Sequence, residues 1–324
     1  MYHNSPLSLR MVDKEKIQFE KFKPVWWAPE VHTQTVISSF SETKNPRSEK
    51  VEISTPDQDF LELEVVDLKN DQPVVALFHG LEGSSKRHYI QNLMSDLRDQ
   101  GFSSVALNFR GCGERLNLQK RIYHSGETED YKTLFNWIKE NFNNPEIYAV
   151  GFSLGGNALV KSLGELGSNH PISKAVAVSP PYDLKGGSLQ MDHGFNKIYQ
   201  QRFLKTLKEK TELKREQYSD FPIFTGSSVY EFDDQVTGPV HGFKDAEDYY
   251  ETCSSKHFYK DVEKPLLVIH SKADSLCPLE FAPFEDLDKN KNIHTLFTES
   301  GGHVGFISQK RGWLNRTIIK WLSA

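Results

Sequence analysis

The sequence predicts an α/β protein with a mostly parallel, eight-stranded sheet, helices on both faces and an inserted helical cap. Short apolar, β-branched runs alternate with segments of helical period, which is typical of strands covered by helices. The first two runs alternate apolar and polar residues, whereas the later ones are nearly continuously apolar, so we expect a half-exposed antiparallel pair joined to a buried parallel sheet. One long excursion breaks the alternation and predicts the insertion.

Eight runs are the predicted strands. The antiparallel pair comprises residues 51–55 and 61–68, where polar and apolar side chains alternate. The central parallel strands, expected to be buried on both faces, are residues 73–80, 103–111, 146–153, 173–180 and 264–271. A last apolar run, residues 293–300, completes the predicted sheet.

Amphipathic segments between these runs are the predicted helices. Residues 87–101 end at a glycine, and residues 127–142 begin with acidic side chains that suit a helix N-terminus. Residues 312–324 are predicted to form a C-terminal helix. Strand and helix segments therefore follow one another in the order of an open α/β sheet.

The alternation stops between Pro181 and Tyr250. A long, charged, helix-forming stretch, residues 195–217, precedes an aromatic and acidic stretch, residues 230–243. An excursion of this length is more typical of an inserted cap than of a structureless loop. We predict an N-terminal arm at 1–45, an α/β core formed by 46–180 and 251–324, and a cap or lid at 181–250.

Composition excludes several classes of protein. The net charge is -5 and the 39 Lys and Arg form no basic block, so we expect no nucleic-acid partner. The cysteines, Cys112, Cys253 and Cys277, are odd in number and lack C-x-x-C spacing, which argues against a disulfide framework and fits a reducing compartment. The chain shows no signal peptide and no run long enough to span a bilayer, so we expect a soluble, cytoplasmic protein. Its oligomeric state stays open.

Gly151-Phe152-Ser153-Leu154-Gly155 is a G-x-S-x-G motif between a predicted strand and a predicted helix. A strand that turns abruptly into a helix needs small residues on both sides of the turn, and the serine hydroxyl then projects from the carboxyl edge of the sheet. This is the pattern of a nucleophile elbow. A glycine turn that carries an inert serine is the alternative.

A serine nucleophile needs a base, and the base needs a third group to orient it. On such a sheet the acid and then the histidine follow the serine along the chain, each in a loop after a later strand. Asp274 and His303 occupy these two places. The rivals are His79, His124 and His241, which also lie beside glycines, and Asp183, which follows an earlier strand. His303 is favoured by position, and Asp274 is favoured because Asp183 leads directly into the predicted cap.

An oxyanion hole is the third requirement of acyl transfer, and the loss of one donor typically costs about 3 kcal/mol of barrier. The backbone N–H of Leu154, directly after the serine, is one predicted donor. The other is the N–H of Leu81, because His79 and Gly80 end a central strand and a small residue there lets the chain turn inward. An ordinary strand-to-loop glycine is the alternative for Gly80.

No cofactor or metal is expected. Cys112 has no histidine near it in sequence, so a buried thiol is a better interpretation than a nucleophile. H-E-x-x-H and paired-cysteine spacings are absent, and the HGLEGSS segment has the wrong spacing for a dinucleotide fingerprint. The adjacent Asp233 and Asp234 cannot easily face one ion, so we expect them to make polar contacts that support the cap.

Several segments together resemble the α/β-hydrolase family of bacterial YheT-like hydrolases, whose eukaryotic relatives are abhydrolase-domain lipases that act on acylglycerols and phospholipids. These segments are WWAPEVHTQTVISS, HGLEGSS, NFRGCGE, YHSGETED, GFSLGGN, EFDDQVTGPVHGFKDAEDYY and GGHVGF. The resemblance covers nearly the whole chain. It departs from the family in the acid loop, where Ser275 follows Asp274 and the proline arrives only at Pro278. The membrane anchor of the eukaryotic lipases is also missing from this sequence.

The resemblance implies an α/β-hydrolase fold and carboxylic-ester hydrolysis, with Ser153 as nucleophile, Asp274 as acid and His303 as base. Short- or medium-chain acyl esters or lipids are the implied substrates. Aromatic residues of the insertion are predicted to form an apolar acyl pocket, with plain packing of the cap as the alternative: Phe195, Tyr199, Phe203 and Phe232. A thioesterase or amidase with the same triad, and a non-catalytic binding protein on the same fold, are the alternative functions.

Overall fold

The computed structural model describes residues 17–38, 42–143 and 145–324. Its centre is one eight-stranded sheet with the strand order β1-β2-β4-β3-β5-β6-β7-β8. The strands are β1 (Glu49–Ser54), β2 (Phe60–Val66), β3 (Val74–Phe78), β4 (Ser103–Asn108), β5 (Ile147–Phe152), β6 (Ile172–Val178), β7 (Leu266–Ser271) and β8 (Ile293–Thr298). β1 pairs with β2 and β2 with β4 in antiparallel fashion, and all other pairs are parallel. The predicted fold class is confirmed.

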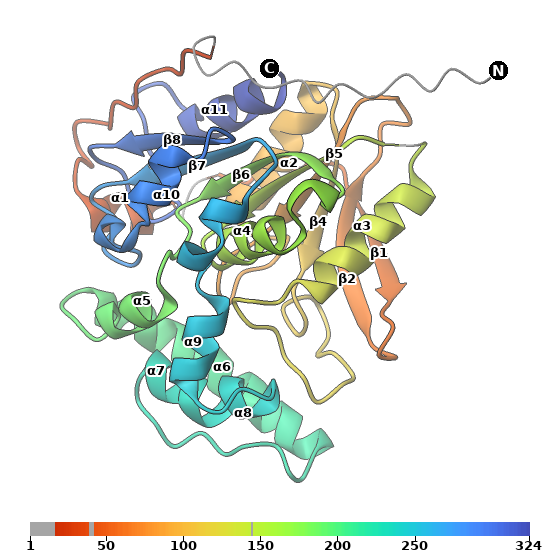
Figure 1. Ribbon diagram of the computed structural model, residues 1–324, viewed down its shortest axis with the longest axis vertical. Helices are drawn as coiled ribbons and strands as arrows, with labels where there is room; N and C mark the ends of the chain where they lie inside the picture. Colours follow the sequence, from red (N-terminus) through yellow and green to blue (C-terminus); the bar gives the residue numbers. More distant parts are fainter. Residues whose placement is uncertain (1–16, 39–41, 144) are drawn as a thin grey trace.

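Helices cover both faces of the sheet (Figure 1). Alternate residues of β3 point to opposite faces. Phe78 and Ala76 belong to one apolar cluster with helix α3 (Glu129–Asn141) and helix α4 (Leu154–Leu166), whereas Val75 and Leu77 belong to a second cluster on the other face. That second face is covered by α2 (His88–Asp99) and α11 (Trp313–Leu322).

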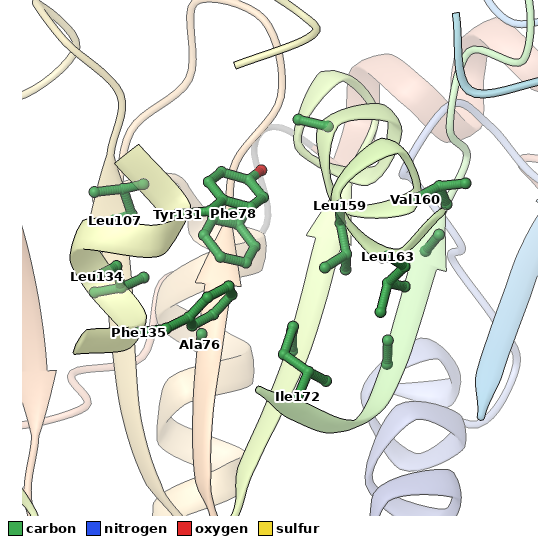
Figure 2. Close-up of a cluster of buried hydrophobic side chains, with 14 of the residues drawn as sticks. Ala76, Phe78, Leu107, Tyr131, Leu134, Phe135, Leu159, Val160, Leu163 and Ile172 are labelled. Carbon is green, nitrogen blue, oxygen red and sulfur yellow. The ribbon is translucent and has the colours of Figure 1, made fainter. Parts of the chain in front are cut away.

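The first cluster includes the start of α4, the helix that begins directly after Ser153. Figure 2 shows the rings of Phe78, Tyr131 and Phe135 gathered between β3 and α3, and Leu159 and Leu163 of α4 facing Ile172 of the sheet. The Phe78 and Tyr131 rings stack with centroids 3.7 Å apart, and the Tyr131 hydroxyl donates to the Gly155 carbonyl at 3.1 Å. The start of α4 therefore rests on a packed aromatic layer.

β2 differs from the expectation of a half-exposed strand. Glu64 alternates correctly with the apolar residues but is only 2 % exposed, because Ser48 and Lys86 cover its carboxylate and donate hydrogen bonds to it. The alternation in the sequence therefore marks the two faces of β2 but not their exposure to solvent.

The segment between β6 and β7 contains no strand among its residues, all of which the structure describes. It holds α5 (Leu184–Gln190), α6 (Asn196–Gln217), α7 (Val229–Phe232), a π-helical turn (Asp233–Thr237), α8 (Gly238–Val240) and α9 (Ala246–Cys253). These helices gather at one end of the molecule, beyond the sheet (Figure 1). They have an apolar cluster of their own, built from Leu204, Leu207, Phe221, Val229, Phe232 and Val236.

The remaining elements connect the sheet and the helices. They are α1 (Val31–Ser38), α10 (Phe284–Lys289) and short 3₁₀ turns at Gly167–Asn169, Ser255–His257, Tyr259–Asp261 and Leu279–Phe281. Within the described ranges, no helix is both long enough and apolar enough to cross a membrane.

Candidate active site

Ser153 lies at the turn between β5 and α4 with φ 52° and ψ -120°, a backbone conformation that L-residues rarely adopt. Its N–H donates to the Val178 carbonyl at 2.8 Å, which ties the turn to β6. A Cβ on Gly155 would lie 2.6 Å from the carbonyl oxygens of Phe78 and His79, and one on Gly151 would overlap Gly155 itself. The two glycines are therefore required by close approach of the backbone, as the motif predicts.

Ser153, His303 and Asp274 lie in one hydrogen-bonded line. The Ser153 hydroxyl is 2.8 Å from Nε2 of His303, and Nδ1 of His303 is 2.8 Å from Oδ2 of Asp274. Asp274 also accepts the backbone N–H groups of Leu276 and Cys277 through Oδ1, at 3.0 and 3.1 Å. In this arrangement Nδ1–H donates to the carboxylate, and Nε2 accepts the serine hydroxyl.

The charges of the His303–Asp274 pair stabilise each other. Burial by itself raises the pKa of the Asp274 carboxyl, but the adjacent His303 outweighs it, so this pKa is lowered. Burial by itself lowers the pKa of the His303 imidazole, but Asp274 and the neighbouring Cys277 outweigh it, and this pKa is raised well above 6.5. His303 is thus more basic than an ordinary histidine.

A cavity of about 790 Å³ opens beside these residues. Ser153, His303, Leu81 and Leu154 all line it. A Cβ on Gly80 would lie 3.1 Å from the Ser153 Cβ, which shows how closely the loop after β3 approaches the turn after β5.

Helices of the 181–250 segment supply most of the apolar wall of the cavity. Tyr199, Phe203 and Phe232 line it. Phe195 does not: its side chain is 44 % exposed and packs against His32, with ring centroids 4.5 Å apart. Phe195 directly precedes α6, and Tyr199 lies four residues after Phe195. Residues four apart share one face of a helix. This spacing does not show that Tyr199 reaches the cavity and Phe195 does not.

The rival histidines contact other groups, although His124 also lines the cavity. His79 is fully buried, its Nε2 accepts the Phe109 N–H at 3.1 Å, and burial lowers its pKa to about 3. His124 and His241 pack against each other with ring centroids 4.4 Å apart, and burial lowers the pKa of each, to about 3 and about 2. These three imidazoles are neutral at pH 7.

The rival acid Asp183, the adjacent Asp233 and Asp234, and the rival thiol of Cys112 have other surroundings. Asp183 caps α5 through the Gly186 N–H and pairs with Lys256 at 2.7 Å. Asp233 accepts hydrogen bonds from Thr237 and Tyr250, while Asp234 accepts the Ala246 N–H. Cys112 is buried, which raises the pKa of its thiol to about 11. Among the described residues, no three His, Cys, Asp or Glu side chains gather so as to hold a metal ion.

The N-terminal helix α1 contributes contacts that sequence reasoning did not assign. The Thr35 hydroxyl accepts the backbone N–H of His303 at 2.9 Å. The side chain of Gln34, which is fully buried, accepts the N–H of Ile307 and donates to the carbonyls of Ile307 and Ala28. Thr35 and Gln34 belong to the HTQT stretch of the predicted arm, residues 32–35. The spacing of its polar residues does not reveal their contacts.

The fold and this site together define the class. A model of the α/β hydrolase fold matches residues 73–309, so the chain belongs to the α/β hydrolase family. The family that the sequence segments resemble is thereby confirmed.

Individual relatives narrow the class. The chain is 34 % identical to the "Putative esterase YheT" of Escherichia coli K12 over 94 % of this chain and 93 % of that one. It is 28 % identical to the human phospholipase ABHD3 over 89 % of this chain and 74 % of that one. The esterase Pf2001 of Pyrococcus furiosus shares the fold with a TM-score of 0.60, at 20 % identity over 94 % of this chain and 98 % of that one. The chain is a carboxylic ester hydrolase of the esterase and lipase type.

Proposed function

We propose that the protein is a serine esterase that cleaves short- to medium-chain acyl esters or lipids through an acyl-enzyme on Ser153. The observation that supports this most strongly is the line of two 2.8 Å contacts from Ser153 through His303 to a buried aspartate, beside a cavity with an apolar wall. The relatives named esterase and phospholipase agree with this class of reaction.

In the proposed reaction, Ser153 Oγ attacks the ester carbonyl while His303 Nε2 takes its proton. The charge that develops on the carbonyl oxygen is bound by the N–H groups of Leu81 and Leu154. His303 then returns the proton to the departing alcohol, which leaves the acyl group on Ser153. Water, deprotonated by the same imidazole, releases the acid and restores the serine. Asp274 holds the imidazole in the tautomer that this sequence of steps needs.

We also propose that residues 181–250 form a cap, attached to a core of 46–180 and 251–324 with an arm at 1–45. The cap would bind the acyl chain, because Tyr199, Phe203 and Phe232 face the cavity that contains Ser153. Apolar walls with few polar groups are typical of sites that take a chain of methylenes.

A chain-length series tests the reaction and the pocket together. We expect the wild type to hydrolyse p-nitrophenyl esters with a maximum between C2 and C16, and Ser153→Ala to lose at least about 10⁴-fold in kcat. Phe203→Trp should shift the maximum to shorter chains, because it narrows the cavity. Phe195→Trp, outside the cavity, should leave the maximum in place.

The outcomes separate the alternatives. A flat profile from C2 to C16 in the wild type would contradict the acyl pocket. Faster hydrolysis of acyl thioesters or anilides than of the matching esters would favour the thioesterase or amidase alternative, which the same triad could serve. No hydrolysis of any acyl substrate by the folded wild type would favour a non-catalytic binding protein on this fold.

A further inference from the structure

An ion pair between a half-buried lysine and a buried glutamate joins helix α6 of the proposed cap to the loop that carries Leu81. Nζ of Lys210 lies 2.8 Å from Oε1 of Glu82, and the two side chains are 22 % and 5 % exposed. Glu82 follows Leu81 directly in the chain. Lys210 does not line the large cavity, so it reaches the site only through the residues it contacts.

Other contacts hold Glu82 through its N–H, its carbonyl and Oε1. The Tyr123 hydroxyl donates to Oε1 at 2.6 Å, and the Glu82 N–H donates to the Tyr123 oxygen at 2.9 Å. Arg87 donates to the Glu82 carbonyl at 2.7 Å. Glu82 also has φ 51°, a conformation that a glutamate adopts only when its surroundings hold it there.

Among the contacts of Glu82 that the structure describes, only the one with Lys210 comes from the 181–250 segment. Burial by itself lowers the pKa of its ammonium, but Cys112, whose Sγ lies 3.2 Å away, and Glu82 outweigh it, so the pKa is raised. The lysine is therefore charged at neutral pH. Removal of one partner of a buried pair leaves the other charge uncompensated, so a Glu82 without Lys210 would turn toward water and take the loop with it.

We propose that Lys210 is a positioning residue for the oxyanion hole: by holding Glu82 it fixes the direction of the Leu81 N–H. This inference rests on the proposed function and adds to it that the site is complete only when α6 is docked. An oxyanion donor acts on the transition state and not on the bound ester, so its displacement lowers kcat and leaves KM nearly unchanged.

The test compares Lys210→Met, Lys210→Arg and the control Lys205→Met, which removes the same charge from an exposed position of α6. We expect Lys210→Met to lose about 10- to 100-fold in kcat on the best p-nitrophenyl ester, less than the loss of a whole donor, with KM within about threefold. Lys210→Arg should recover part of the rate, since a guanidinium can also pair with Glu82. Lys205→Met should retain wild-type kcat within about twofold.

A tetrahedral inhibitor gives a readout that a merely structural lysine would not move. A trifluoromethyl ketone adds to Ser153 and places an oxyanion in the hole, whereas the matching long-chain alcohol binds without one. Lys210→Met should weaken the ketone by about the factor lost in kcat and leave alcohol binding within about twofold. Equal weakening of both ligands would overturn the positioning role.

Glu82→Gln keeps the test decisive if Lys210→Met does not fold. This variant retains the size of the side chain and an acceptor for Tyr123 but removes the charge that Lys210 holds. We expect it also to lower kcat, and the double variant Glu82→Gln/Lys210→Met to lose no more than the worse single one, because the two residues act as a unit. Unchanged kcat in Glu82→Gln, or additive losses, would overturn the inference.

The outcomes also separate this inference from the proposed function. If Ser153→Ala abolishes hydrolysis while Lys210→Met keeps wild-type kcat, the serine mechanism stands and the role of Lys210 is wrong. If Ser153→Ala keeps full activity, the mechanism itself is wrong, whatever Lys210 does.

Discussion

The turn that carries Ser153 and the loop that carries His303 reach the same cavity by different means. The glycines that the serine turn needs stand next to the serine in the chain, since Gly151 and Gly155 leave room for the backbones of β5, α4 and β3 to approach. The histidine loop is held by a helix 268 positions earlier in the chain, through the bond from the His303 N–H to the Thr35 hydroxyl.

Glycines serve both regions, but they make room for different neighbours. A Cβ on Gly302 would lie 2.5 Å from the Thr35 nitrogen, and one on Gly305 would lie 2.5 Å from the Gln34 carbonyl oxygen. In the histidine loop the glycines thus admit α1, whereas in the serine turn Gly151 admits the start of α4 and Gly155 admits the end of β3. A local motif can therefore specify a nucleophile, while the placement of the base depends on tertiary packing.

The largest effect should come from the acid that orients His303. Asp274→Asn preserves the shape of the side chain but offers Nδ1 an amide that can favour the wrong tautomer, so we expect kcat to fall about 10⁴-fold. Steady-state kinetics on a p-nitrophenyl ester measure this. Asp183→Asn, the rival acid, should lose a fraction of stability through the α5 cap but keep its kcat. The reverse pattern would assign the acid to Asp183.

Breaking the serine turn should have the next largest effect. Gly155→Ala forces a Cβ against the strand carbonyls of Phe78 and His79, which cannot move aside, so we expect about 1–3 kcal/mol less stability to urea and more than about 100-fold less activity. Gly101→Ala is the control, because Gly101 also has a positive φ, 86°, but no atom lies within 4 Å of an added Cβ. It should lose stability through backbone strain alone and retain its activity. Equal losses of activity in both would contradict a role for close packing at the turn.

Breaking the histidine loop from a distance should have a smaller effect. Thr35→Val keeps the shape of the side chain but leaves the His303 N–H without its acceptor, which we expect to lower kcat about tenfold. Thr35→Ser, which keeps the hydroxyl, should restore most of the rate. Thr33→Val, on the same helix, should leave kcat unchanged. A Thr35→Val enzyme with wild-type kcat would show that the loop holds His303 without α1.

The pH profile should show the smallest but most specific difference. Only the neutral imidazole can accept the serine proton, so activity rises as the pH rises through the pKa of His303. Because Asp274 and Cys277 raise that pKa well above 6.5, we expect the acid limb of kcat/KM to lie above pH 6.5. Thr35→Val should leave the limb in place, since it moves the ring without changing its charged neighbours. An acid limb below pH 6.5 in the wild type would contradict the claim that Asp274 stabilises the protonated form of His303.

The contrast between these regions also explains what the sequence could predict. The strands of the parallel core and the turn at Ser153 follow from local patterns, namely apolar runs and glycines beside a serine. The places of Asp274 and His303 follow from chain order on a known type of sheet. The exposure of Phe195 and the burial of Glu64 could not be predicted from the sequence. Helical or strand spacing assigns a side chain to a face but does not say what covers that face.

Two long-range contacts also could not be predicted from the sequence. Thr35 and Lys210 are ordinary polar residues in the sequence, and their partners, His303 and Glu82, lie 268 and 128 positions away. No periodicity or motif connects residues so far apart. Only the folded backbone brings them within hydrogen-bonding distance.

The central claim is that His303 activates Ser153, and the rate of covalent labelling tests it most directly. A fluorophosphonate probe should react with the wild type at one site, which peptide mass spectrometry should locate at Ser153. The rate should fall at least about 10³-fold in His303→Ala, and Ser153→Ala should give no adduct. An adduct on another residue, or equal labelling rates in the wild type and in a folded His303→Ala variant, would contradict the account.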